Sequence, residues 1–173
     1  MDFEDFARAE LPGLLRYAAV LSGDRDLAGD LVQEVLVRTQ AKWGRISRVE
    51  HPELYVRRMV TNEFLSWRRR WHVRMIRPAS REALESSAGQ TPDVSAAVVD
   101  RDEARTRLQG LPPRQRAILV LRFYEGLSDS EIAGVLGCPA GTVRSAASRA
   151  LATLRIADGA TTPPARLVNG DLR

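Results

Sequence analysis

The feature of this sequence that most constrains its fold is a helical pattern that lapses once, in the middle of the chain. Over residues 1–72 and again over residues 104–157, apolar side chains recur every three or four residues, the spacing of amphipathic helices. Residues 73–103 lose that spacing and mix proline, serine and glycine with acids and arginines, a composition typical of linkers. The pattern predicts an all-α protein in which two small helical domains are joined by a flexible linker.

The length of this linker would allow the two domains to separate. Fully extended, residues 73–103 could reach on the order of 100 Å, enough to place the domains far apart on a large partner. After the second domain, residues 158–173 contain Thr161-Thr162-Pro163-Pro164 and are predicted to form a disordered tail.

Composition argues against membrane and secreted classes. No apolar run approaches the roughly 18 residues needed to span a bilayer, although hydrophobic residues make up 44% of the chain. The acidic start, Met1-Asp2-Phe3-Glu4-Asp5, lacks the basic residues and apolar run of a secretory signal. We therefore expect a soluble cytoplasmic protein with no membrane partner.

Residues that bind metals or carry catalysis are scarce. The single cysteine, Cys138, allows no internal disulfide and no multi-cysteine zinc site, and His51 and His72 cannot form an H-E-x-x-H helix. The only lysine, Lys42, follows alanine rather than glycine, so there is no Walker A loop. We expect a protein that is not an enzyme, with no metal, no cofactor and no small-molecule substrate. Cys138 is predicted to be a small packed turn residue.

Charge is divided into blocks along the chain. Residues 1–34 carry eight acids and three arginines, net −5, whereas residues 57–81 carry eight arginines and one glutamate, net +7. Residues 82–103 return to net −5. Such blocks predict separate surfaces for separate partners, with a polyanion as the natural partner of the basic block.

The second domain carries the pattern of a helix-turn-helix. Ser128 and Glu131 have the spacing of a capping box, in which the two side chains satisfy backbone amides at a helix start. The helix that follows meets Gly137, a residue suited to the left-handed turn after a helix, and a new helix is expected from about Gly141. A short helix, a glycine turn and a longer helix are typical of this DNA-binding motif.

The second helix of this motif separates apolar from polar residues. Its apolar face contains Val143, Ala147, Ala150, Leu151 and Leu154, and its other face contains Arg144, Ser145, Ser148 and Arg149 with no acid. Arginine can bind guanine edges or phosphate, and small serines allow close approach to the major groove. We favour DNA binding over the alternative, an ordinary amphipathic helix with a solvated polar face.

The third helix of the first domain combines arginines with aromatic residues. Its predicted exposed face contains Arg57, Arg58, Thr61, Asn62, Ser66 and Arg69, with Arg68 and Arg70 adjoining. Basic charge beside aromatic rings suits single-stranded nucleic acid, although Trp67 and Trp71 fall on the apolar stripe and are predicted to be core. The arginines are predicted to contact DNA, the alternative being a solvated surface.

The second helix of the first domain offers the opposite charge. Asp30, Gln33 and Glu34 share one face, which would repel DNA and therefore suits a protein partner. On spacing alone, simple solvation of these side chains is nearly as good an explanation.

Three stretches of the chain resemble, in order, the conserved regions of bacterial sigma factors. Residues 28–35, A-G-D-L-V-Q-E-V, are similar to the A-x-D-L-V-Q-E-x-F motif of region 2.2, with Leu36 in place of the usual phenylalanine. Residues 52–62 and 66–70 resemble regions 2.3 and 2.4, and residues 111–145 resemble region 4, with Pro139 near a common capping serine. The chain is identified as an extracytoplasmic-function (ECF) sigma factor of the sigma-70 family, closest to an actinobacterial subfamily.

This resemblance implies partners and residue roles. Core RNA polymerase would bind Asp30, Gln33 and Glu34. The minus-10 element would be melted and read by Arg57, Arg58, Thr61, Asn62, Arg68 and Arg69, with Asn62 close to the pocket for a flipped base. The minus-35 element would be read by Thr142, Arg144, Ser145, Ser148 and Arg149. The family is commonly held inactive by an anti-sigma factor, which is a further expected partner.

The main alternative is an autonomous helix-turn-helix regulator. Such a protein would use its second domain alone to bind a palindromic site as a dimer, without RNA polymerase.

Overall fold

The computed structural model describes residues 1–76 and 96–158, and every regular element in these ranges is a helix. The all-α class predicted from the sequence is confirmed. The predicted tail, apart from Asp158, and residues 77–95 of the predicted linker lie outside the described residues. No helix within the described ranges combines the length and the hydrophobicity that crossing a membrane requires.

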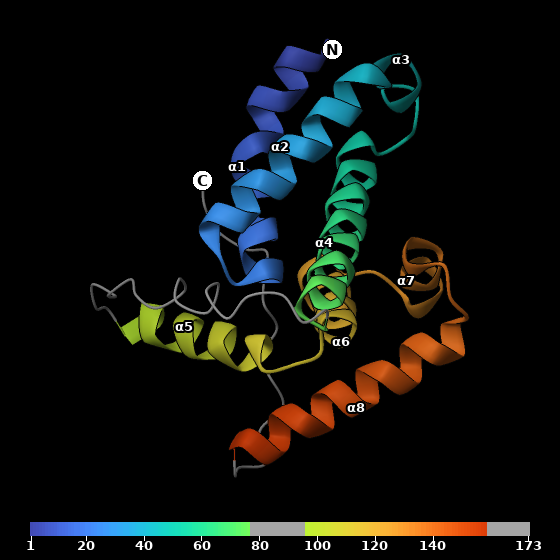
Figure 1. Ribbon diagram of the computed structural model, residues 1–173. Helices are drawn as coiled ribbons and strands as arrows, with labels where there is room; N and C mark the ends of the chain where they lie inside the picture. The colour runs from blue at the N-terminus through green and yellow to red at the C-terminus, as the bar shows by residue number, and fades with distance from the viewer. Residues whose placement is uncertain (77–95, 159–173) are drawn as a thin grey trace.

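The first half of the chain is a small bundle of helices. It contains α1 (Phe3–Ser22), α2 (Arg25–Ala41), the short α3 (Trp43–Ile46) and the long α4 (Pro52–Ile76). α1 and α2 lie side by side and antiparallel, and α4 packs against both (Figure 1). Gly23, whose φ of 81° is left-handed, ends α1, and the Asp24 side chain caps the start of α2.

α1 runs without a break through Pro12. Proline removes one backbone hydrogen bond from a helix, but Pro12 is exposed while Phe6 and Leu14 on the same helix are buried in the core. Packing of the apolar face therefore outweighs the lost bond.

The second half contains the helix-turn-helix. Its elements are α5 (Ala96–Gln109), α6 (Pro113–Leu119), the π-helical turn η1 (Val120–Tyr124), α7 (Asp129–Leu136) and α8 (Ala140–Asp158). α6, η1 and α8 supply most of its buried residues, and α8 packs across α6 and α7. α4 and α5 extend helical structure into both ends of the predicted linker, over residues 73–76 and 96–103.

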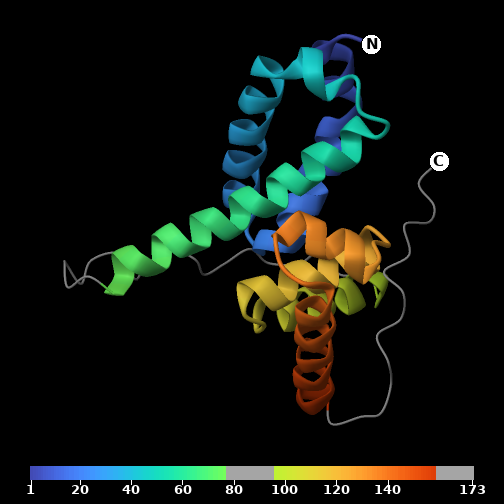
Figure 2. The ribbon, with the colours of Figure 1, turned by 90° about the vertical axis from the view of Figure 1, so that its right-hand side faces the viewer.

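The two halves pack against each other. Buried residues of α1, α2 and α4 and buried residues of α6, η1 and α7 belong to one contiguous apolar cluster. α4 contacts both α6 and α7, and Figure 2 shows the second half lying beneath the middle of α4. The predicted DNA-binding face of α4 is therefore close to the second half.

Candidate nucleic-acid interface

Both ends of α7 are set by residues that the sequence singled out. The Ser128 hydroxyl accepts a hydrogen bond from the Glu131 N–H at 3.3 Å, and the Glu131 carboxylate accepts one from the Ser128 N–H at 2.8 Å. The capping box is therefore formed, and hydrogen bonds from the Ser128 hydroxyl and N–H lower the pKa of Glu131 below its ordinary value. Gly137, with φ of 60°, ends α7 so that α8 begins at Ala140. Cys138 lies in this turn, half-buried as predicted.

α8 turns its predicted polar face to solvent. Val143, Ala147 and Ala150 are buried, together with Ala146. The exposed side chains of this helix include all five predicted for minus-35 recognition: Thr142, Arg144, Ser145, Ser148 and Arg149. The helix therefore offers hydrogen-bond donors to a DNA groove without uncovering its core.

One acid from α7 approaches this face. Asp129 Oδ2 lies 3.5 Å from Arg144 Nε, and the other oxygen of Asp129 pairs with Arg122. From Thr142 to Arg149 the exposed face of α8 carries no acid of its own, but spacing did not reveal that α7 contributes one. The Arg144 side chain remains 74% exposed, so this pair orients the guanidinium and leaves it accessible.

α4 divides its predicted DNA-binding residues between solvent and the protein interior. Asn62 and Arg69 are exposed, whereas Arg58 and Arg68 are half-buried. Arg57 Nη1 donates to Glu125 Oε2 of the second half at 2.9 Å. The basic face is therefore only partly open.

The prediction that Thr61 lies on the exposed face is wrong. Its side chain is fully buried, its Oγ1 lies 2.6 Å from the hydroxyl of Tyr17, and it donates to the Arg57 carbonyl at 3.2 Å. The buried hydroxyl of Tyr17 needs a polar partner, and Thr61 lies where α4 meets α1. Burial raises the pKa of Tyr17, so this phenol stays protonated beside Thr61.

Trp71 also departs from its predicted core position. Its side chain is 40% exposed, whereas Trp67 is half-buried, because the end of α4 projects beyond the bundle (Figure 2). The two rings stack with centroids 6.4 Å apart, and the Arg68 guanidinium lies 5.2 Å from the Trp71 centroid. An exposed aromatic surface therefore adjoins the basic residues.

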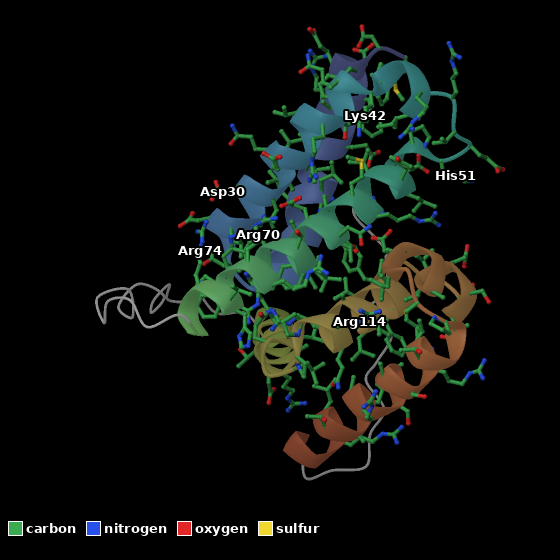
Figure 3. All side chains as sticks on the ribbon, turned by 45° about the vertical axis from the view of Figure 1, so that its right-hand side comes forward. Asp30, Lys42, His51, Arg70, Arg74 and Arg114 are labelled. Carbon is green, nitrogen blue, oxygen red and sulfur yellow. The ribbon has the colours of Figure 1, made fainter. Side chains whose placement is uncertain are left out.

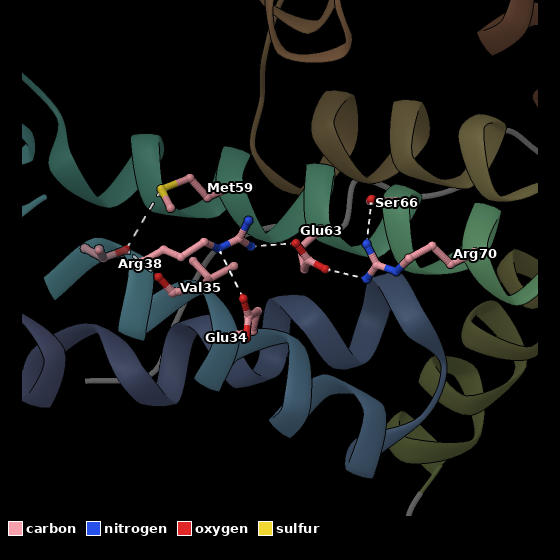
Figure 4. Close-up of polar contacts among 8 residues, drawn as sticks. Glu34, Val35, Arg38, Met59, Glu63, Ser66 and Arg70 are labelled. Atoms are coloured by element: carbon pink, nitrogen blue, oxygen red, sulfur yellow. Dashed lines mark hydrogen bonds and ion pairs between the residues drawn. The ribbon is translucent and has the colours of Figure 1, made fainter. Parts of the chain in front are cut away.

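Glu63, the single acid of the basic block, joins α4 to α2 (Figure 4). Its carboxylate accepts hydrogen bonds from Arg38 at 2.6 Å and from Arg70 at 2.8 Å. Burial alone would raise the pKa of Glu63, but these two hydrogen bonds hold it below its ordinary value. Arg38 Nε also lies 3.7 Å from Glu34, so alternating charges run from the acidic face of α2 to the basic helix. Sequence reasoning missed this role, although a lone acid in a run of arginines was an available signal.

Asp30, Gln33 and Glu34 lie exposed on α2, as helical spacing predicted, and Figure 3 shows Asp30 at the outer surface. Beside them, an apolar groove of about 320 Å³ lies between α1 and α2 and includes Gln33 in its lining. Leu11 and Val37, which also line the groove, are 39% and 59% exposed. An apolar groove beside polar residues is typical of a protein-binding surface.

The fold defines an all-α protein with a helix-turn-helix in its second half, a motif typical of DNA-binding proteins. Two family models match the chain: Sigma-70 region 2 over residues 6–74, and Sigma-70, region 4 over residues 101–154.

Individual relatives extend over most of the chain. The RNA polymerase sigma-E factors of Streptomyces avermitilis and Streptomyces coelicolor are each 36% identical over 155 residues, which is 90% of this chain and 84% and 85% of theirs. The ECF RNA polymerase sigma factor EcfG of Rhodopseudomonas palustris is 34% identical, over 88% of this chain and 84% of its own. The sigma factor RpoE of Bartonella quintana, solved in complex with the anti-sigma factor NepR, is similar in structure, with a TM-score of 0.68 and 26% sequence identity. The match covers 93% of this chain and 99% of the RpoE chain.

This chain therefore belongs to the extracytoplasmic-function group of the sigma-70 family, and it is a sigma factor. Matches to both regions in the family order do not favour the alternative of an autonomous helix-turn-helix regulator.

Proposed function

We propose that this chain binds core RNA polymerase through the acidic face of α2 and directs it to promoters that α8 and α4 recognise. The observation that carries the proposal is the separation of three surfaces of different chemistry on one family scaffold: Asp30 with Glu34 on α2, the donor face of α8 and the basic face of α4. The chain acts in the cytoplasm by binding alone, and polymerase supplies the chemistry.

Recognition of the minus-35 duplex is assigned to α8. Arg144 and Arg149 are exposed and can bind guanine edges bidentately or grip phosphate, and Ser145 and Ser148 between them are small enough for close approach. Thr142 at the start of the helix is exposed and supplies a hydroxyl for a phosphate.

Opening of the minus-10 segment is assigned to α4. Asn62 is exposed and has both an acceptor and donors, so it can bond the edge of an unstacked base. Arg58, Arg68 and Arg69 would follow the backbone of the separated strand, and Trp71 offers a ring for base stacking. Thr61, which is buried, would act only by supporting this helix through Tyr17.

An anti-sigma factor is the proposed negative regulator. The support for this partner is indirect: the Bartonella quintana sigma factor was solved in complex with one.

Co-elution with core polymerase tests the proposal. The wild-type chain should co-elute with core enzyme, and Asp30→Arg with Glu34→Arg should lose most of this binding because the acidic face is reversed. A matched control reverses Glu50 and Glu103, two exposed acids elsewhere, and should bind normally. Circular dichroism verifies folding of each variant. Normal co-elution of the α2 variant would remove this face as the docking site, and failure of the wild type to bind would contradict the proposed function.

A further inference from the structure

Asp129, the first residue of α7, lies between two arginines that come from different elements. One of its carboxylate oxygens pairs with Arg122 on η1, and the other lies 3.5 Å from Arg144 Nε on α8. The Asp129 and Arg122 side chains are half-buried, whereas the Arg144 side chain lies open to solvent. A chain of alternating charge therefore runs from the core of the second half to the outer face of α8.

The inner end of this chain of charges is fixed. Val120 and Leu121, which precede Arg122 on η1, are buried, so the backbone that carries Arg122 is held in the core. The backbone at Asp129 is held by the capping box at the start of α7. A carboxylate whose backbone is fixed, and whose inner oxygen pairs with a fixed arginine, has little freedom to turn. Its outer oxygen therefore marks a constant position for the guanidinium of Arg144.

The atom of Arg144 that the acid approaches matters for recognition. A guanidinium carries its N–H groups in a planar fork, and an ion pair at Nε leaves those on the two terminal nitrogens for a ligand. Within residues 1–76 and 96–158, no other group pairs with Arg144. Guanine presents two neighbouring acceptors, O6 and N7, whereas adenine presents a donor beside its N7. An Arg144 held in this way therefore favours guanine over the other bases.

Arg149, the other arginine assigned to the minus-35 element, has no such partner. Its Nε donates to the Ser145 carbonyl of its own helix at 3.4 Å, and no acid pairs with it in the part of the chain that the structure describes. An arginine without an acid to hold it can turn toward a base or toward a phosphate. The two arginines of α8 therefore differ in how firmly they are oriented, although both are exposed.

We propose that Asp129 sets the base preference of the minus-35 reader by holding Arg144 so that its terminal nitrogens face a guanine. This inference rests on the proposed function, and in particular on α8 as the helix that reads the minus-35 duplex. Asp129 is a positioning residue, since it acts through Arg144 and does not itself contact DNA.

A positioning acid has two opposite effects on DNA binding. Its negative charge repels nearby phosphates, so it weakens binding to every sequence alike. By restricting Arg144, it also favours sequences that place a guanine opposite this side chain. Loss of Asp129 should therefore lower base preference without lowering affinity for unrelated DNA. An acid that only stabilised the start of α7 would, when lost, weaken binding to all sequences together.

Selection of promoter DNA by the holoenzyme tests the proposal. Core polymerase carrying each variant is bound to a duplex library randomised over the minus-35 segment, and the bound DNA is sequenced. Wild type should prefer guanine at the position that Arg144 reads, and Asp129→Asn should reduce that preference about 5-fold while affinity for a scrambled duplex stays unchanged or rises. Asp129→Glu keeps the charge and should retain the preference. Glu131→Gln makes the same charge change in the same turn, and its amide can complete the capping box, so it should match the wild type.

A double-mutant cycle separates positioning from direct contact. Asp129→Asn should have no further effect on base preference once Arg144→Ala is present, whereas its effect should add to that of Arg149→Ala. Circular dichroism and co-elution with core polymerase verify folding and assembly. Full guanine preference in the Asp129→Asn holoenzyme would overturn the inference, and so would a loss of preference that persists in the Arg144→Ala background, because the carboxylate would then read a base itself. A wild-type holoenzyme that selects no minus-35 sequence would instead contradict the proposed function.

Discussion

The outer face of α8 and the basic face of α4 carry similar residues but differ in availability. The Arg144 side chain on α8 is 74% exposed, and the acid beside it, Asp129, is 23% exposed. The Arg57 side chain on α4 is 20% exposed, and its partner, Glu125, is 2% exposed. The difference lies in what packs against each helix. α8 packs on α6 and α7 through one face only, while α4 is enclosed by α1 and α2 on one side and α6 and α7 on another. Arginine content predicts a DNA-binding helix, and long-range packing decides whether the face of that helix is exposed.

Arg116→Ala should have the largest effect, because Arg116 joins α6, which packs against α4, to the end of α1. Arg116 is 4% exposed and donates to the Leu21 and Leu111 carbonyls. Burial and the charge of Arg68 lower its pKa to about 10, so it is still charged at pH 7. Removing it leaves a cavity and unpaired carbonyls, and we expect a loss of about 1–3 kcal/mol in the free energy of unfolding for each carbonyl left unpaired, measured by urea denaturation.

Arg114→Ala is the matched control for this variant, since Arg114 is an exposed arginine on the same helix (Figure 3). Its effect should be within about 0.5 kcal/mol. Equal effects at the two positions would show that the contact around Arg116 does not stabilise the chain.

Arg144→Ala and Arg149→Ala come next and test the free surface. Each should weaken promoter recognition by the holoenzyme by about 1–3 kcal/mol if the side chain bonds a base bidentately. A phosphate contact would weaken binding to all sequences alike, so binding is measured on matched and scrambled minus-35 duplexes. Unchanged affinity in both variants would exclude α8 as the reader.

Ser128→Ala should have the smallest effect and stay local to the helix-turn-helix. Losing the N-cap of α7 should lower the stability of the chain by about 1 kcal/mol, measured by thermal unfolding. Co-elution with core polymerase should not change, since Ser128 bonds only within its own turn in the described residues. Loss of co-elution would show that polymerase binding depends on the helix-turn-helix cap.

The same comparison explains what the sequence could predict. The helix-turn-helix could be predicted because the residues that determine it are close in sequence. Ser128 bonds Glu131 three residues away, and Gly137 ends the helix that these two residues start. The burial of Arg57 and Thr61 on α4 could not be predicted from local spacing. Arg57 and its partner Glu125 are 68 residues apart in the sequence, and Thr61 and its partner Tyr17 are 44 residues apart. Trp71 fitted the apolar stripe, but periodicity does not say where the bundle beneath a helix ends.

Permanganate reactivity of promoter thymines tests most directly the claim that α4 opens DNA only within the polymerase complex. The minus-10 thymines are compared with chain alone, core polymerase alone, wild-type holoenzyme and Asn62→Ala holoenzyme. We expect reactivity with wild-type holoenzyme and none with the chain alone or core polymerase alone. Asn62→Ala should reduce this reactivity while holoenzyme assembly and minus-35 binding persist, and a pre-melted template should recover part of the lost activity. Equal reactivity of wild type and Asn62→Ala would show that Asn62 is not a melting residue, and no reactivity with wild-type holoenzyme on any promoter selected from the genome would contradict the account.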